Sequence, residues 1–287
     1  MSISEGLLER RGRVVSDLRR HRRIIVALSG GVDSAVLLGL ARNALGQSNV
    51  LAITGVSESL AHAELEDARR VASELGTDHE IITTHELDRL AYRANEGDRC
   101  FHCRSELFEL LTTLAEKRGY DAVAYGAIVD DLGDVRPGME AARRLGVVAP
   151  LLEAGIGKSD VRELAQWMSL HIDDKPASPC LASRIPTGTE VTPERLRQIE
   201  RAESALRSLG LRLFRVRHHG DIARIEMGEQ DFGRILELHA SISRAVRSAG
   251  FRYVAVDLDG YRAAGAASAD PAPVTLYSIA PSRESGQ

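Results

Sequence analysis

Six consecutive residues combine flexible backbone, hydroxyl groups and a carboxylate, a set that suits phosphate binding. They read Ser29-Gly30-Gly31-Val32-Asp33-Ser34 and stand between a buried apolar run and a helical pattern. Gly30 and Gly31 would let the backbone approach a phosphate without a Cβ clash, and the following helix would offer free N–H groups. Ser29 and Ser34 would add hydroxyl donors, and Asp33 could hold Mg²⁺ on the phosphates. The segment therefore predicts a site for a phosphorylated ligand.

The kind of phosphate site follows from what the segment contains and lacks. It has no Gly-Lys-Ser/Thr ending, so it is not the phosphate loop of the P-loop NTPases. The six residues match the pyrophosphate loop of AMP-forming enzymes, which split ATP between the α and β phosphates. A tight strand-to-helix turn is the alternative, and the six-residue match makes it the weaker interpretation. We therefore expect an enzyme that adenylates its substrate.

The three cysteines of the chain are the second group with chemical potential. Cys100 and Cys103 form a Cys-x-x-Cys pair, and Cys180 lies far along the sequence. Two thiolates at this spacing can reach one metal from a single turn. Zinc needs four ligands, whereas three thiolates suit a [4Fe–4S] cluster with one open iron. Buried small side chains, a redox dithiol and half of a zinc site remain open alternatives for the pair.

Cys180 lies in a loop stiffened by Pro176, Pro179 and Pro186. Arg184 follows four residues later, and a nearby cation lowers the pKa of a thiol. We therefore expect Arg184 to favour the Cys180 thiolate, as a reactive or ligating thiol requires. A buried structural cysteine is the alternative, although such cysteines usually lie within a strand or helix.

Two arginines at a spacing of two are the third group. Arg215 and Arg217 would project from the same face of a strand and could bind carboxylates or phosphate. From the spacing alone, a solvated strand face is the simpler interpretation. His218 and His219 follow directly; a ligand role remains open for them, and a loop position is the stronger interpretation.

Apolar runs alternate with helical patterns before Pro150. Strands are expected at 24–28, 50–54, 79–82 and 122–125, and helices near 7–20, 36–40, 61–75 and 104–117. This alternation predicts an α/β fold with a parallel, doubly wound sheet. A further helix is expected to begin after an N-cap at Ser159 or Asp160 and to end at about Met168.

The pattern changes beyond the proline-rich loop. A helix with apolar residues from Leu196 to Leu209 precedes strands at 211–217 and 222–227, a helix over 232–242 and a strand at 251–257. This order predicts a small α+β domain. We expect an ATP-binding domain at 1–175, a small α+β domain at 176–262, and a disordered tail at 263–287 that is rich in Ala, Ser and Pro.

Composition narrows the classes of protein that remain. The chain has 287 residues, 44% hydrophobic and 27% charged, and a net charge of −4, which argues against a dedicated nucleic-acid binder. No apolar run approaches the length of a membrane helix, and the N-terminus lacks a secretory pattern. Three cysteines are too few for a disulfide scaffold. We therefore expect a cytoplasmic enzyme without a membrane partner.

Taken together, these motifs resemble the ATP-dependent sulfur transferases (LarE type) of the nickel-pincer nucleotide pathway. The resemblance covers roughly residues 10–262. The matching segments are Ser29–Ser34, Arg99-Cys100-x-x-Cys103, residues 131–138, Pro176–Arg184 and Arg215-x-Arg217-x-His219-Gly220-Asp221.

The resemblance implies adenylation of a carboxylate of pyridinium-3,5-biscarboxylic acid mononucleotide and its conversion to a thiocarboxylate. ATP would be bound by Ser29, Gly30, Gly31, Asp33, Ser34, Ser57 and Gly126, with Mg²⁺ on Asp33. The substrate would be bound by Arg184, Arg215 and Arg217, and the family also implies a homo-oligomer, a hexamer.

Sulfur supply divides the family into two types. In one, the single cysteine matching Cys180 attacks the acyl-adenylate, gives up its sulfur and is left as dehydroalanine. In the other, cysteines matching Cys100, Cys103 and Cys180 hold a [4Fe–4S] cluster whose open iron carries an extra sulfide. This chain has all three cysteines and no others, so the resemblance favours the cluster type.

One departure and two rival functions remain. The chain has Ala127-Ile128 where the family pattern would have Thr-Asn, so two hydrogen-bonding side chains near the expected nucleotide are missing. A tRNA thiolase shares the loop and often three cysteines, but it needs an RNA-binding surface. An ammonia-using ligase such as NAD synthetase shares the loop but gives the cysteines no role.

Overall fold

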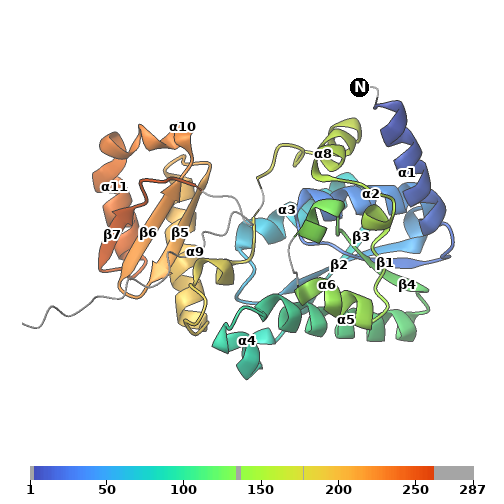
Figure 1. Ribbon diagram of the computed structural model, residues 1–287, viewed down its shortest axis with the longest axis horizontal. Coiled ribbons are helices and arrows are strands. Elements are labelled where there is room, and N and C mark those ends of the chain that lie inside the picture. Colours follow the sequence, from blue (N-terminus) through green and yellow to red (C-terminus); the bar gives the residue numbers. More distant parts are fainter. Residues whose placement is uncertain (1–2, 134–136, 177, 262–287) are drawn as a thin grey trace, which may run out of the picture.

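A four-stranded parallel sheet with helices on both faces forms the N-terminal part of the chain (Figure 1). The computed structural model describes residues 3–133, 137–176 and 178–261. The strand order is β3-β2-β1-β4. The strands are β1 (Ile24–Ala27), β2 (Val50–Val56), β3 (Asp78–Thr83) and β4 (Ala122–Tyr125). The helices are α1 (Glu5–Leu18), α2 (Val32–Leu45), α3 (His62–Glu74), α4 (Leu90–Ala94), α5 (Arg99–Arg118), α6 (Pro137–Arg144), α7 (Pro150–Glu153) and α8 (Lys158–Trp167). The expected α/β fold is confirmed.

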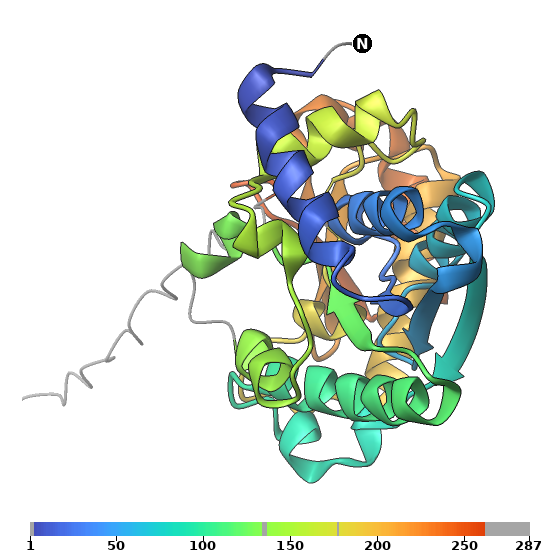
Figure 2. The same cartoon turned by 90° about the vertical axis from the view of Figure 1, so that its right-hand side faces the viewer.

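The alternation of side chains along β1 explains the two layers of helices. Ile24 and Val26 are fully buried against α1, α2 and α8, whereas Ile25 is fully buried against α5 on the other face. A strand covered on both faces needs apolar residues at every position, and this is what the run 24–28 provides. Figure 2 shows the two helical layers on opposite sides of the sheet.

A three-stranded mixed sheet forms the C-terminal part. β5 (Phe214–His219) pairs antiparallel with β6 (Ile222–Met227), which pairs parallel with β7 (Tyr253–Val256). α9 (Pro193–Ser208) and α11 (Ile235–Ser248) pack on this sheet through an apolar core, and α10 (Glu229–Phe232) precedes α11. This agrees with the predicted order of elements.

Several element boundaries differ from the prediction. β5 begins at Phe214 and continues through His218 and His219, so the expected loop position of both histidines is wrong. The turn comes one residue later, at Gly220, whose φ of +62° favours glycine.

The expected cap of α8 is also wrong. The helix begins at Lys158, and Asp160 lies in its first turn, where its carboxylate accepts the Gly157 N–H at 3.0 Å. The expected tail at 263–287, Asp134 to Arg136 and Ala177 lie outside the described residues. Within the described residues, no helix is long and apolar enough to cross a membrane.

Candidate functional site

The predicted phosphate loop joins β1 to α2 and is closed by its own serines. The Ser34 hydroxyl donates to the Gly31 carbonyl at 3.0 Å and accepts the Ser29 N–H at 3.2 Å. Gly30 has a φ of +77°, and a Cβ there would lie 2.3 Å from the Glu64 carbonyl oxygen. Gly31 is the N-cap of α2, so the amides of the first turn have no intrahelical acceptor and can meet an anion.

Gly126 follows β4 and lies against this loop. A Cβ at Gly126 would lie 2.7 Å from the Ser34 nitrogen, so only glycine allows the close approach. The next residues, Ala127 and Ile128, are each 3% exposed and pack into the cores on opposite faces of the sheet. Their apolar side chains therefore serve packing, which accounts for the departure from the Thr-Asn pattern in physical terms.

Asp33 carries an ion pair that the sequence does not predict. The Lys158 ammonium lies 2.8 Å from Oδ1 and 3.0 Å from Oδ2 of Asp33. Burial raises the pKa of Asp33, Lys158 opposes this shift, and the neighbouring carboxylates of Asp131 and Asp130 reinforce it. Carboxylates of three aspartates thus lie close together at the loop, and the Lys158 ammonium is paired with that of Asp33.

A second lysine holds the loop from the other side. Lys175 Nζ donates to the Gly30 carbonyl and to Glu64 Oε2, both at 2.8 Å, and lies 2.5 Å from Asp67 Oδ2. Residue counts could have drawn attention to both side chains. The chain has three lysines among 37 basic residues, and two of them lie at this loop.

Ser57 follows β2 and belongs to a buried polar cluster. Its hydroxyl donates to Glu86, and the Ser59 hydroxyl donates to the same carboxylate oxygen at 2.6 Å. Glu86 is 1% exposed, and its other oxygen has no hydrogen-bond partner among the described residues. Sequence reasoning identified Ser57 and missed Glu86, because the two are 29 residues apart and meet only in the fold.

The three thiols lie near one another beside this cluster. Cys100 and Cys103 are in the first turn of α5, and Cys180 lies in the segment whose next residue, Leu181, donates its N–H to the Ser59 carbonyl at 2.8 Å. Arg99 donates to the Ala182 carbonyl and so joins α5 to the Cys180 segment. The fold therefore brings together two cysteine positions that are almost 80 residues apart in the sequence.

The electrostatics of the thiols differ from the expectation. Cys100 and Cys180 are exposed and Cys103 is half-buried, yet the protein around Cys180 desolvates its thiolate and raises its pKa. Cys100 adds to this effect, and Arg99 and Arg184 oppose it without reversing it. Arg184 thus lowers the pKa of Cys180, as predicted, but burial outweighs this effect and the net shift is upward. Burial, Glu86 and the two other thiols also raise the pKa of Cys103.

A single metal ion has no preformed site among residues 3–133, 137–176 and 178–261. No three His, Cys, Asp or Glu side chains there are spaced to hold one. The ligands of a four-iron cluster bind different irons and stand farther apart than the ligands of one ion. Three thiols that influence one another's pKa are a donor set of the kind that such a cluster takes.

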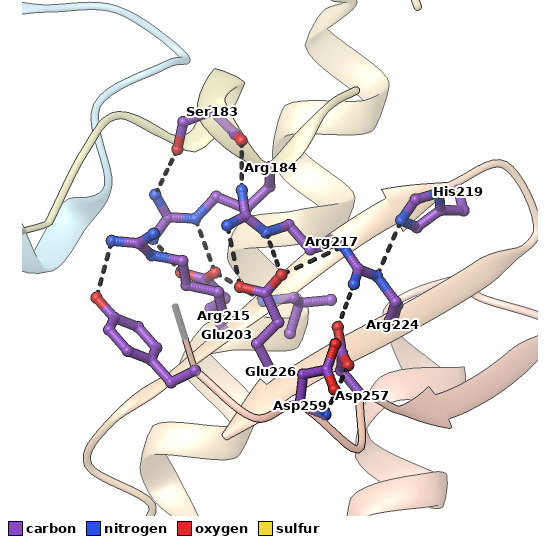
Figure 3. A network of polar contacts seen from close by, with 12 residues as sticks. Ser183, Arg184, Glu203, Arg215, Arg217, His219, Arg224, Glu226, Asp257 and Asp259 are labelled. Carbon is purple, nitrogen blue, oxygen red and sulfur yellow. Dashed lines mark hydrogen bonds and ion pairs between the residues drawn. The ribbon is translucent and has the colours of Figure 1, made fainter. Parts of the chain in front are cut away.

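Arg184 is the centre of a buried ion pair under the Cys180 segment. Its Nε and Nη2 donate to Glu203 at 2.9 and 3.1 Å, and its Nη1 donates to the carbonyls of Pro179 and Cys180. Glu203 also accepts the Val216 N–H of β5 at 3.0 Å. One carboxylate therefore fixes the Cys180 segment on the C-terminal sheet (Figure 3).

Arg215 and Arg217 lie on β5 beside this pair, and the solvated strand face suggested by their spacing is wrong. Arg215 is 2% exposed, donates to the Tyr261 hydroxyl at 2.8 Å and stacks on its ring. Arg217 makes two bonds to Glu226, at 2.9 and 3.0 Å, and a third to the Ser183 carbonyl. Figure 3 shows Arg184, Arg215 and Arg217 side by side, with Arg217 bonded to the Ser183 carbonyl.

Comparison with known proteins relates the chain to one family model and to two similar proteins. The sequence model of the NAD synthase family matches residues 13–106. The chain is 38% identical to the pyridinium-3,5-bisthiocarboxylic acid mononucleotide synthase of Lactiplantibacillus plantarum, over 89% of this chain and 93% of that protein. It is 43% identical to a Synechocystis protein, slr1717, over 84% and 90%.

A solved structure supports the fold. The NMN synthetase of Francisella tularensis aligns with a TM-score of 0.50 and 21% identity, over 62% of this chain and 76% of that one. At this identity the match concerns the fold alone.

Proposed function

The chain belongs to the LarE family of pyridinium-3,5-bisthiocarboxylic acid mononucleotide synthases, and from this premise we propose its reaction. It adenylates a carboxylate of pyridinium-3,5-biscarboxylic acid mononucleotide and replaces the adenylate by sulfur. AMP and pyrophosphate leave, and a thiocarboxylate forms. Adenylation turns a carboxylate oxygen, which is a poor leaving group, into AMP, so that a sulfur nucleophile can attack near neutral pH.

One segment carries the proposal, because it reaches both the phosphate loop and the thiols. Lys175 bonds to the Gly30 carbonyl, and Cys180 follows five residues later, beside Cys100 and Cys103. Five residues span at most about 18 Å when extended. An acyl-adenylate with its phosphate at the loop could therefore present its carbonyl carbon to sulfur at the thiols.

The phosphate loop would perform the first half of the reaction. The amides of α2 with Ser29, Gly30, Gly31 and Ser34 would hold the phosphates, Asp33 would hold Mg²⁺, and Ser57 and Gly126 would contact the adenosine. Mg²⁺ is bound in proteins by one or two carboxylates together with substrate phosphates, which suits Asp33 at the loop. The cation would neutralise the departing pyrophosphate.

The thiols would perform the second half. Cys100, Cys103 and Cys180 would hold a [4Fe–4S] cluster, which would supply the sulfur nucleophile when bound. The protein's own part is to hold Cys180 still, through the bonds from Arg184 to the Cys180 carbonyl and to Glu203. With the sulfur drawn from the cluster, Cys180 would be retained and the enzyme could turn over repeatedly.

Arg184, Arg215 and Arg217 would bind the phosphate and the second carboxylate of the substrate. Arg217 and Arg184 already face Glu226 and Glu203, so the substrate would enter a network of alternating charges. Bidentate pairs of this kind hold the arginines in fixed positions. We further propose domains at 1–175 and 176–262, a cytoplasmic location and a homo-hexamer.

A coupled assay tests this function. Anaerobically purified protein, supplied with iron, sulfide, ATP and the biscarboxylate mononucleotide, is expected to release AMP and pyrophosphate and to form the thiocarboxylate. An unchanged substrate would contradict the proposal. RNA binding that weakens steeply with salt would favour a tRNA thiolase instead. Full activity with ammonia after all three cysteines are changed to Ser would favour an amide-forming ligase.

A further inference from the structure

Asp33 is held by the Lys158 ammonium through both of its carboxylate oxygens. The two contacts are 2.8 and 3.0 Å long, and the side chains of Lys158 and Asp33 are 31% and 28% exposed. The pair is therefore partly buried, and Asp33 lies in the first turn of α2, directly after the glycines of the predicted phosphate loop.

The backbone of Lys158 is fixed by hydrogen bonds, whereas its side chain is long and has four rotatable bonds. Lys158 is the first residue of α8, and its N–H donates to Asp130 Oδ2 at 2.8 Å. The preceding amide, that of Gly157, is held by Asp160 at 3.0 Å. The ammonium can thus change partners around an anchored Cα, and a compact ammonium with rotatable donors suits such an exchange better than a planar guanidinium.

Two further carboxylates lie close to the pair. Asp130 Oδ2 accepts the Lys158 backbone N–H at 2.8 Å, and the charges of Asp130 and Asp131 both act on Asp33. Because the Lys158 ammonium occupies both oxygens of Asp33, a divalent ion must displace it before it can bind there. Among the described residues, no three acidic, His or Cys side chains form a ready metal site.

We propose that Lys158 is the resident cation of the Asp33 site, which excludes free divalent ions and yields the carboxylate to Mg²⁺ only when the metal arrives with a nucleotide. The inference rests on the proposed role of Asp33 as a metal ligand. Asp33 would then exchange the Lys158 ammonium for Mg²⁺, and the released ammonium would pair with the phosphates of the nucleotide. The Asp33 carboxylate thus has a cation beside it both without and with the nucleotide, first the ammonium and then Mg²⁺. The protein binds the metal–nucleotide complex in preference to the bare metal.

Two binding measurements on one pair of variants test the inference without an activity assay. Mn²⁺ binding to the ATP-free protein is followed by the loss of the free-ion electron paramagnetic resonance signal. Binding of Mg–ATP is followed by titration calorimetry. K158M removes the charge at similar length, K158R keeps the charge and is the matched control, and D33N removes the carboxylate.

The expected changes have opposite signs. K158M is expected to bind Mn²⁺ about tenfold tighter than the wild type, because a competing cation is gone, and to bind Mg–ATP about tenfold more weakly. K158R is expected to keep the low Mn²⁺ affinity. Weaker binding of both ligands by K158M would mean a structural role, and unchanged Mn²⁺ affinity would overturn the inference.

Two further variants, D33N and K158M/D33N, distinguish a failure of this inference from a failure of the metal-binding role proposed for Asp33. K158M/D33N is expected to lose the gain in Mn²⁺ affinity. If K158M gains affinity and K158M/D33N keeps that gain, the metal binds elsewhere and the metal-binding role proposed for Asp33 is wrong. If K158M gains nothing while D33N alone abolishes Mn²⁺ binding in the presence of ATP, Asp33 binds metal and only the role of Lys158 is wrong.

Discussion

The guanidinium of Arg184 joins the carboxylate of Glu203 to the backbone of the segment that carries Cys180. Their side chains are 5% and 4% exposed, so the pair is shielded from water. Glu203 comes from α9 and also accepts an N–H of β5. This charge pair, together with the bond from Arg217 to the Ser183 carbonyl, therefore fixes the Cys180 segment on the C-terminal sheet.

Breaking this pair should destabilise the protein strongly. R184M or E203Q is expected to lower the free energy of unfolding by about 3–5 kcal/mol, because each leaves a buried charged group without its partner. Urea unfolding followed by circular dichroism measures the loss. The double variant R184M/E203Q should lose less than the sum of the single losses, and strictly additive losses would contradict the coupling.

A methyl group at Gly126 should block the nucleotide site. In G126A the new Cβ would meet the Ser34 nitrogen at 2.7 Å and push β4 away from α2, so ATP affinity is expected to fall at least about tenfold. Calorimetric titration with ATP gives the affinity. The control is G12A in α1, where a Cβ has nothing within 4 Å. Equal ATP affinity in G126A and the wild type would exclude this packing explanation.

Each cysteine should be needed for iron. C100S, C103S and C180S are each expected to lose most of the iron and the broad visible absorbance after anaerobic reconstitution, because serine replaces a thiolate ligand. H102A is the control, since His102 lies between two cysteines but bonds to Asp98 at 3.0 Å. Retention of iron by all three serine variants would rule out the three-cysteine cluster.

Stability should fall in mild acid. Burial lowers the pKa of His218, whose side chain is 4% exposed and packs on Phe251. The unfolded state therefore binds a proton at His218 near pH 6.5, whereas the folded state binds it only at lower pH. The contribution of neutral His218 to the free energy of unfolding is present above pH 6.5 and is lost as pH falls through the folded pKa.

His218→Gln tests this source of acid sensitivity. The free energy of unfolding is measured at pH 7.5 and pH 5.5 for both proteins. The wild type is expected to lose more stability than the variant over this interval, because glutamine does not titrate. His79, whose pKa burial also lowers, should leave a residual pH dependence in the variant. An identical loss in both proteins would assign the effect to other groups.

Local patterns in the sequence predicted the parts of the fold whose causes are local. Three neighbouring segments were predictable from their own residues: the run at 24–28, the loop at 29–34 and the helix that follows. Consecutive apolar residues indicate a buried strand, and glycines with hydroxyl groups before a helix indicate a turn that binds phosphate. Cys180 could be singled out by its proline-rich surroundings. The structure then placed it beside Cys100 and Cys103.

The remaining parts of the site depend on contacts between distant residues. Lys158 reaches Asp33 across 125 residues, and Glu203 meets Arg184 from another helix. Each looks in sequence like an ordinary charge on a helix surface. The two histidines after Arg217 were misplaced because a glycine one residue further on, and not the charge pattern, ends β5.

Counting products per chain, together with the intact mass of the chain, tests the central claim most directly. The protein is reconstituted anaerobically with iron and sulfide, then given ATP and the biscarboxylate mononucleotide. Sulfur transfer through a cluster held by the three cysteines predicts more than one thiocarboxylate per chain and an unchanged mass at Cys180. At most one product per chain, with a chain lighter by one molecule of H₂S, would contradict it and show that Cys180 surrenders its own sulfur.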